Sequence, residues 1–221
     1  MARGFLIILF YIGAFIVILF AAAGRLNWGM GWTTVGIRTV ISLTALFLVD
    51  PELVEERSQI GPGIKHWDMV LASLSLLFVY PFTLAVARLD AGRFGWSPSF
   101  HWAVQAAALV VFALGNGLAL WAALSNRYFS TFVRLQEDRG QAVVREGPYR
   151  FIRHPGYAGI IAAALALPIA LGSLWALIPA VIGTGGFVLR TFLEDKTLSK
   201  ELMGYEEYAR QVRYRLMPGI W

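Results

Sequence analysis

The 221-residue sequence contains no cysteine and few charged side chains, and both absences restrict what the chain can be. Without cysteine, disulfide bonds, thiolate zinc sites and cysteine nucleophiles are excluded. The only three histidines, His66, His101 and His154, are too scattered in sequence to predict a metal cluster. Charged residues make up 15% of the chain, against about 25% in a soluble domain. Since 57% of the residues are hydrophobic, the composition indicates a protein embedded in lipid.

The net charge of +5 does not by itself indicate a nucleic-acid partner. In a membrane protein, an excess of Lys and Arg in the cytoplasmic loops sets the orientation and attracts anionic lipids. We therefore expect the bilayer, and no nucleic acid, among the partners of this chain. The sequence leaves the oligomeric state open.

Uncharged stretches predict an all-α membrane protein with about six (five to six) transmembrane helices. Residues 4–24 carry no charge, and this stretch can cross a hydrocarbon core of about 30 Å. It is longer than the usual signal-peptide core of about 7–15 residues, so we predict a retained span. Further spans are expected at residues 32–49, at residues 69–87 with a kink at Pro81, and within residues 94–126 after Pro98. The polar residues 50–65 between two of them predict a solvated loop.

Two of the stretches differ from a simple apolar span, one because it contains a charge and the other because it is too long. Residues 32–49 include Arg38, so this helix must face protein or be only partly inserted. Residues 154–189 are uncharged over 36 positions, and one helix of that length would measure about 54 Å, well beyond a single bilayer. Because Pro168 and the pair Gly172-Ser173 offer a turn, we predict a hairpin of two helices.

The distribution of basic residues agrees with the hairpin. With six crossings and a cytoplasmic N-terminus, 15 of the 19 Lys and Arg residues fall on the cytoplasmic side, and Arg88 and Arg93 fall in an outer loop. This asymmetry is the one expected of membrane proteins. We therefore predict cytoplasmic N- and C-termini and one structural domain in two parts. Residues 1–125 form the N-terminal transmembrane helices, and residues 126–221 form a connector, the hairpin and a cytoplasmic tail helix.

Polar residues that are able to form a site accumulate at the two cytoplasmic ends of the hairpin. His154 and Pro155 predict a helix start, whose free N–H groups can receive an anionic group. Arg190 and Glu194 are four residues apart and share a helix face. A surface ion pair would explain the second cluster equally well. The hairpin, however, returns both clusters to one membrane face. Gathering polar and charged side chains beside lipid costs free energy, so we expect these residues to have a function.

The connector and the tail allow two interpretations. Most arginines of residues 126–153 fit a positively charged anchor on the membrane surface. The tail predicts a short amphipathic helix that ends near Pro218 and lies on the membrane or closes over the site. Tyr205, Tyr208 and Tyr214 suit interfacial anchors as well as ligand contacts. The run Gly183-Thr184-Gly185-Gly186 lies inside an apolar helix, which predicts helix packing rather than a nucleotide-binding loop.

Three ordered motifs resemble the isoprenylcysteine carboxyl methyltransferase family and its bacterial relatives. They are GPYRFIRHPGYAG at residues 147–159, Arg190-x-x-x-Glu194-Asp195-x-x-Leu198, and GYEEYARQVRYRLMP at residues 204–218. The resemblance covers about the last 100 residues. The second motif usually carries two glutamates, and here Asp195 replaces the second one, which shortens that acid by one methylene.

The resemblance implies an enzyme that transfers a methyl group from S-adenosylmethionine to a lipid or other lipophilic acceptor, with its active site facing the cytoplasm. It implies no metal. Residues expected to contact the cofactor are Tyr149, His154, Pro155, Tyr157, Gly159, Glu194 and Asp195. Arg190 is expected to orient the acceptor together with Arg153, so that Arg190, Glu194 and Arg153 form the catalytic set.

The acceptor stays open among a prenylated cysteine, a phospholipid, an isoprenoid and a small thiol. A carboxylate acceptor needs no general base, whereas an amine or thiol would need Glu194 or His154 as the base. Two other functions compete with methyl transfer. An NADPH-dependent membrane reductase of the sterol-reductase type has a similar His-Pro-x-Tyr ending, and a non-catalytic membrane scaffold or carrier could retain the same helices.

Overall fold

The computed structural model describes residues 2–21, 23–24, 26–49, 53, 63–136 and 139–221, and within these ranges helices are the only regular secondary structure. The all-α prediction is confirmed. Most of the predicted loop 50–65, including Glu52, Glu55, Glu56 and Arg57, lies outside the described residues. The main helices are α1 (Ala2–Phe20), α2 (Gly29–Leu48), α4 (His66–Leu77), α5 (Thr83–Ala87), α6 (Trp102–Ser125), α7 (Pro155–Leu171), α8 (Leu177–Glu201) and α9 (Tyr205–Gln211).

Four helices are long and apolar enough to cross a membrane, namely Gly29–Leu48, His66–Phe94, Trp102–Ser125 and Leu177–Glu201. Two shorter apolar helices, Phe5–Phe20 and Pro155–Leu171, cover the remaining predicted spans. Each predicted span therefore corresponds to an apolar helix. Four helices thus meet the length and composition of a full span, and six crossings remain a prediction.

The helix His66–Phe94 is longer than predicted. It runs without interruption through α4, the π-helical turn η1 (Phe78–Phe82), α5 and a second π-helical turn, η2 (Arg88–Phe94). Pro81 lies in η1, where the Thr83 hydroxyl donates to the Phe78 carbonyl oxygen at 2.8 Å. The prediction of an outer loop containing Arg88 and Arg93 is wrong, since both residues belong to η2.

Hydrogen bonds explain why two charged residues, Arg88 and Asp90, are tolerated in η2. Arg88 donates from an Nη atom to the Ile18 carbonyl oxygen at 3.1 Å. Asp90 is fully buried and accepts from the backbone N–H and hydroxyl of Ser97 and from the hydroxyl of Ser173. The helix therefore continues because its charges are compensated by neighbouring segments.

Arg38 faces protein, as predicted. Its guanidinium donates to Asn116 Oδ1 at 2.8 Å and lies 5.4 Å from the ring centroid of Tyr80. The α2 helix therefore places its one arginine against α6 and η1, with the apolar positions of α2 free to contact lipid.

The predicted hairpin is formed by α7 and α8, and its turn lies at Gly172-Ser173. Gly172 ends α7 with a φ of +77°, a conformation that favours glycine. Pro168 lies inside α7 and does not end it. The α8 helix extends well past Arg190, to Glu201, because Arg190, Thr191 and Asp195 are buried against other segments.

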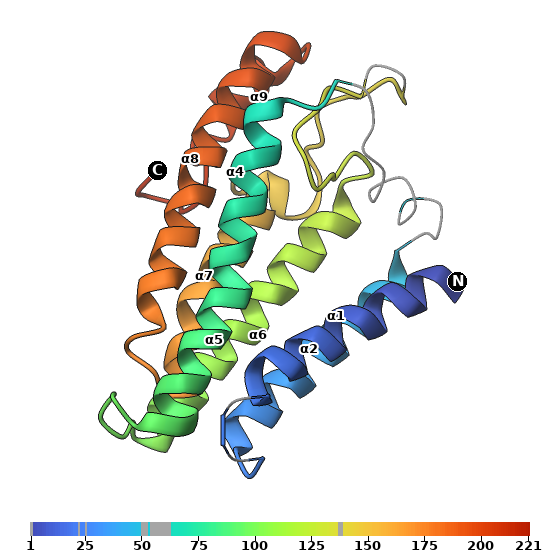
Figure 1. Cartoon of the computed structure of the whole chain (residues 1–221). Coiled ribbons are helices and arrows are strands. Elements are labelled where there is room, and N and C mark those ends of the chain that lie inside the picture. Colours follow the sequence, from blue (N-terminus) through green and yellow to red (C-terminus); the bar gives the residue numbers. More distant parts are fainter. Residues whose placement is uncertain (1, 22, 25, 50–52, 54–62, 137–138) are drawn as a thin grey trace.

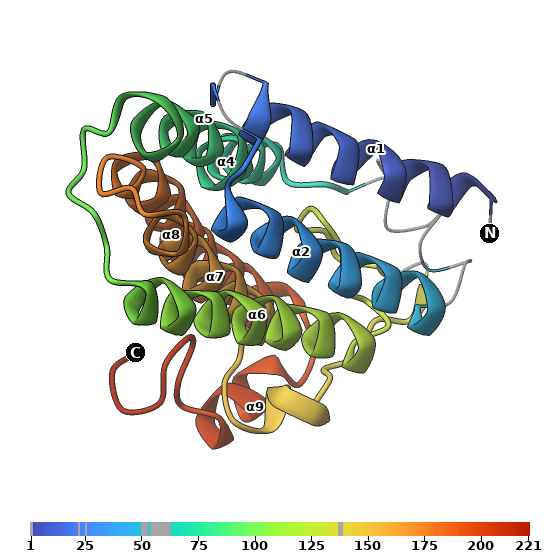
Figure 2. The same ribbon diagram turned by 90° about the horizontal axis from the view of Figure 1, so that it is seen from below.

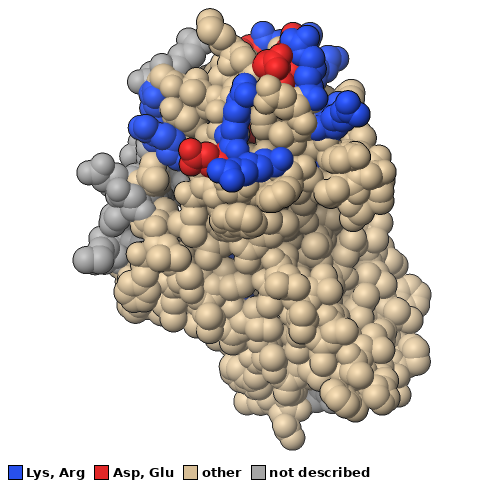
Figure 3. Space-filling view, turned by 180° about the vertical axis from the view of Figure 1, so that it is seen from behind, with Lys and Arg blue, Asp and Glu red and all other residues tan. Residues whose placement is uncertain are grey.

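The hairpin stands among the other long helices, and polar segments collect at one end of the bundle. Figure 2 shows α7 between α6 and α8, with α1 and α2 along one side of the group. The described parts of the connector (residues 126–136 and 139–146) and α9 lie at the end where α4 begins and α8 ends, which we call the polar end (Figure 1). Figure 3 shows Lys and Arg side chains gathered at this end, while the rest of that face is uncharged.

The α6 and α7 helices cross in direct backbone contact at two glycines. A Cβ on Gly159 would overlap the carbonyl oxygen of Gly115 and lie 2.7 Å from the amide nitrogen of Ala119. A Cβ on Gly115 would lie 2.6 Å from the carbonyl oxygen of Gly159. Gly159 therefore serves helix packing, as small residues do in membrane proteins. Gly183 packs closely against Ser75 and Val79, and this confirms the packing interpretation of that glycine run.

Replacing Gly159 by alanine is expected to lower the free energy of unfolding by about 1–3 kcal/mol, because the added methyl forces α6 and α7 apart. Thermal unfolding in detergent measures the effect. Gly117→Ala on α6 is the matched control, since a Cβ there meets nothing within 4 Å. Equal stability of both variants would contradict the close crossing.

Candidate active site

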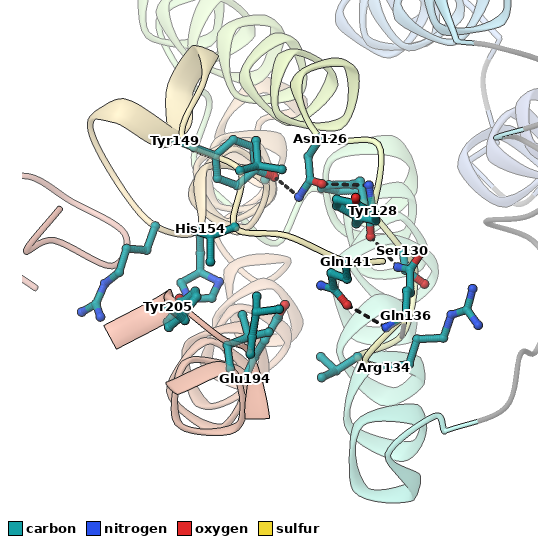
Figure 4. A pocket seen from close by; sticks show the side chains of 18 of the residues that line it. Asn126, Tyr128, Ser130, Arg134, Gln136, Gln141, Tyr149, His154, Glu194 and Tyr205 are labelled. Atoms are coloured by element: carbon teal, nitrogen blue, oxygen red, sulfur yellow. Dashed lines mark hydrogen bonds between the residues drawn. The ribbon is translucent and has the colours of Figure 1, made fainter. Parts of the chain in front are cut away.

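A cavity at the polar end lies between the connector and the hairpin. Its empty volume is about 840 Å³, part of which is open to solvent. One wall carries His154, Glu194 and Tyr205, and the opposite wall carries connector side chains such as Tyr128 and Gln141 (Figure 4). The hairpin thus brings the predicted clusters at residues 147–159 and 190–195 to one place, as expected.

The segment before α7 folds as a tight turn that fixes the first motif. Gly147 has a φ of +56° and opens a 3-10 turn, η4 (Gly147–Arg150). A Cβ on Gly147 would overlap Ser125, so only glycine fits against the end of α6. His154 is the N-cap of α7 and Pro155 its first residue, which confirms the predicted helix start. Pro155 is buried and does not line the cavity.

The tail pairs with this segment through the backbone. The Arg153 N–H donates to the Tyr214 carbonyl oxygen at 3.0 Å, and the His154 N–H donates to the Arg215 carbonyl oxygen at 2.9 Å. Backbone hydrogen bonds alone therefore link the first motif, residues 147–159, to the third motif, residues 204–218.

Asp195 is the centre of a buried polar cluster. Its carboxylate lies 3.1 Å from an Nη atom of Arg153, 2.9 Å from Nε of Arg215 and 3.3 Å from Nε2 of His154, and it accepts from the Tyr205 hydroxyl at 2.9 Å. Asp195 is 3% exposed and does not line the cavity. It therefore joins the three motifs instead of facing a ligand.

Two of the three tail tyrosines belong to the site. Tyr205 and Tyr208 are buried and line the cavity, whereas Tyr214 is exposed and does not line it. Burial, reinforced by the negative charge of Asp195, raises the pKa of Tyr205 well above its usual value, so its hydroxyl remains a donor. Burial likewise raises the pKa of Tyr208, whose hydroxyl donates to the Tyr149 carbonyl oxygen at 2.8 Å. The α9 helix ends at Gln211, earlier than the predicted end near Pro218.

Glu194 is the acid of the second motif that reaches the cavity. It accepts a hydrogen bond from the Tyr157 hydroxyl at 2.5 Å. The Tyr157 ring lies parallel to that of His154, with ring centroids 5.8 Å apart. A carboxylate and two aromatic rings therefore share one wall, a combination that favours a cationic ligand.

Arg190 does not line the cavity and does not pair with Glu194. Its Nε and one Nη atom donate to the two carboxylate oxygens of Asp68, at 2.6 Å and 2.9 Å. This bidentate geometry is the strongest an arginine offers a carboxylate. Asp68 was missed by the sequence analysis, although an acid inside an otherwise apolar helix is a signal that a buried partner exists.

The connector forms a wall of the site and not only a surface anchor. Its uncharged polar lining residues, also missed from the sequence, are Asn126, Tyr128, Ser130, Gln136 and Gln141. Gln141 accepts from the Gln136 backbone N–H at 2.7 Å, and Gln136 donates to the Tyr128 carbonyl oxygen at 2.7 Å (Figure 4). The signal for this role was the uncharged polar residues between the arginines.

The predicted site residues thus fall into two groups. Those that line the cavity are Tyr149, Arg153, His154, Tyr157 and Glu194. Those that do not are Pro155, Gly159, Arg190 and Asp195. Gly159 packs α7 against α6, Arg190 bonds to Asp68, and Asp195 bonds to the lining residue Tyr205.

Comparison with known proteins agrees with this architecture. Residues 103–203 match the phospholipid methyltransferase family. Probable protein-S-isoprenylcysteine O-methyltransferases of Oryza sativa subsp. indica and subsp. japonica are each 24% identical to the chain over 115 residues. These matches span 51% of the chain and 60% of each relative's length.

A solved structure resembles the whole chain. The structure of the eukaryotic intramembrane Ras methyltransferase, isoprenylcysteine carboxyl methyltransferase, superimposes with a TM-score of 0.53 at 20% identity. The superposition covers 100% of this chain and 87% of the other. The fold, the motifs and these matches confirm the resemblance predicted from the sequence: the chain is an integral membrane protein that resembles the isoprenylcysteine carboxyl methyltransferase family.

Proposed function

We propose that the chain transfers a methyl group from S-adenosylmethionine to a lipophilic acceptor, and that the cavity at the polar end holds the cofactor. The observation that carries the proposal is the assembly of His154, Tyr157 and Glu194 on one cavity wall beside apolar helices. The family resemblance supports the same activity, since the relatives are named as methyltransferases.

The residues of the cavity fit the chemical groups of this cofactor. The sulfonium carries a positive charge, which Glu194 and the ring of Tyr157 would attract. The cofactor also carries a carboxylate, and Arg153 lines the cavity to receive one. Among the described residues, none accepts a hydrogen bond from the buried Nε of Arg153. The polar side chains of Asn126 and Gln141 would serve the adenosine part.

The cofactor supplies a reactive methyl group, so the protein has to align the acceptor and exclude water. Glu194 accepts from the Tyr157 hydroxyl, and His154 Nε2 lies within hydrogen-bond distance of Asp195 and Tyr205. A carboxylate acceptor is ionised at neutral pH and needs neither group as a base. The relatives' names, which specify isoprenylcysteine, make a prenylated cysteine with a free carboxylate our first choice.

We also propose that the polar end faces the cytoplasm, with the C-terminal tail and the N-terminus on that side. The collection of Lys and Arg side chains at this end supports this orientation (Figure 3). A lipophilic acceptor would then reach the cavity from the bilayer while the cofactor enters from water. Residues 126–221 would form the catalytic region.

A methyl-transfer assay tests the proposal. The detergent-purified protein is incubated with labelled S-adenosylmethionine and one of three acceptors: an S-prenylated cysteine, its methyl ester, or phosphatidylethanolamine. We expect label in the free prenylcysteine and none in the ester, whose carboxylate is blocked. Label in phosphatidylethanolamine alone would move the acceptor to the phospholipids, in line with the matching family. Label in no acceptor would favour the non-catalytic scaffold, and the relatives do not favour the reductase.

A further inference from the structure

Asp68 is a fully buried acid that holds two walls of the cavity without lining either of them. Its carboxylate accepts from Arg190 of α8 at 2.6 Å and 2.9 Å, and from the backbone N–H of Val133 in the connector at 2.7 Å. Val133 is itself a buried lining residue. One side chain of α4 thus bonds directly to the hairpin and to the connector.

Arg190 extends this contact to the residue that faces the cavity. Its guanidinium donates to the Thr131 carbonyl oxygen at 2.6 Å and lies 4.9 Å from the ring centroid of Tyr157. Tyr157 in turn donates to Glu194 at 2.5 Å. A continuous series of contacts therefore runs from Asp68 through Arg190 and Tyr157 to Glu194.

We propose that Asp68 is a positioning residue for the methyl transfer, which acts by fixing the connector against the hairpin and by setting the orientation of Glu194 through Arg190. This inference rests on the proposed function. A buried acid on an apolar helix is costly unless it is compensated by partners, and the Asp68 carboxylate bonds to Arg190 of the hairpin and Val133 of the connector, the two segments that form the cavity walls. The Lys65 N–H, which donates to the Val133 carbonyl oxygen at 3.1 Å, is a second link between α4 and the connector.

The same continuous helix supplies a matched control. Asp90 is equally buried and equally hydrogen bonded, but its partners Ser97 and Ser173 lie at the opposite end of the molecule from the cavity. Loss of either carboxylate should reduce stability. Only loss of Asp68 should change the cavity.

Two readouts separate positioning from general destabilisation. The first is the affinity for S-adenosylhomocysteine, measured by calorimetry on the detergent-purified full chain. The second is the labelling rate of a single thiol introduced by Val133→Cys, which has no background because the chain lacks cysteine. Asp68→Asn is expected to weaken the affinity at least about tenfold and to accelerate labelling by a similar factor. Asp90→Asn is expected to lower the unfolding temperature while both readouts stay at the wild-type value.

Unchanged affinity and labelling in Asp68→Asn would overturn the inference. If the wild-type chain does not bind S-adenosylhomocysteine, the proposed function fails instead, and the labelling rate still decides whether Asp68 holds the connector. Should Asp68→Asn not fold, Val133→Pro takes its place. This variant removes the N–H that bonds to Asp68, replaces the valine side chain by the proline ring and fixes the backbone φ at residue 133, while both members of the Asp68–Arg190 pair stay in the chain. It is expected to weaken the affinity in the same direction, and wild-type affinity would contradict the proposal.

Discussion

Replacing Glu194 by glutamine is expected to weaken the binding of S-adenosylmethionine about 10- to 100-fold, and that of S-adenosylhomocysteine much less. Glutamine still accepts the hydrogen bond from Tyr157 but removes the negative charge that faces the cavity. Only the methylated cofactor carries the positive sulfonium, and an interaction with a charged group contributes about 1.5–3 kcal/mol. Calorimetric titration with each compound, in the absence of an acceptor, measures the difference.

Glu201→Gln is the control for this experiment. Glu201 lies on the same helix but pairs with Lys65 in a half-exposed ion pair outside the cavity. Its replacement is expected to leave both affinities unchanged, because such surface pairs contribute little. An equal loss of affinity for the two compounds in Glu194→Gln would contradict the placement of the sulfonium beside Glu194.

Replacing Asp195 by alanine is expected to cause the largest loss of stability, about 3–5 kcal/mol. The change leaves the buried Arg153 and the partly buried Arg215 without their carboxylate and frees the tail from α8. For a chain of this size, the midpoint of thermal unfolding should fall by on the order of 10 °C. Circular dichroism in detergent measures the midpoint.

Two variants define the cause of that loss. Asp195→Glu keeps the charge and matches the usual residue of the family motif, so we expect a smaller loss than with alanine. Glu207→Ala removes an acid whose pair with Arg210 is exposed, and its midpoint should equal that of the wild type. If Asp195→Ala unfolds at the wild-type temperature, the cluster does not hold the three motifs together.

The sequence predicted the parts of the site that depend on local patterns. Uncharged length predicted the apolar helices, and the turn at Gly172 predicted that His154 and Glu194 return to the same end of the bundle. The Gly147-Pro148 turn and the helix start at Pro155 follow from backbone preferences of those residues alone.

The missed parts depend on contacts between residues far apart in sequence. Asp68 and Arg190 are separated by 122 positions, and no periodicity links them, so Arg190 was assigned to the acceptor instead of to a buried pair. The connector has no helix across residues 126–136, and its wall follows from individual side-chain bonds such as that of Gln136. Gly159 shows the same limit, because a small residue in a motif fits a ligand contact and a helix crossing equally well.

The cavity at the polar end is expected to bind S-adenosylmethionine and not a nicotinamide cofactor. Calorimetric titration of the detergent-purified protein with S-adenosylhomocysteine and, separately, with NADPH tests this expectation. We expect saturable binding of the first, near one molecule per chain, and no binding of the second. Binding of NADPH alone, or of neither compound, would contradict it.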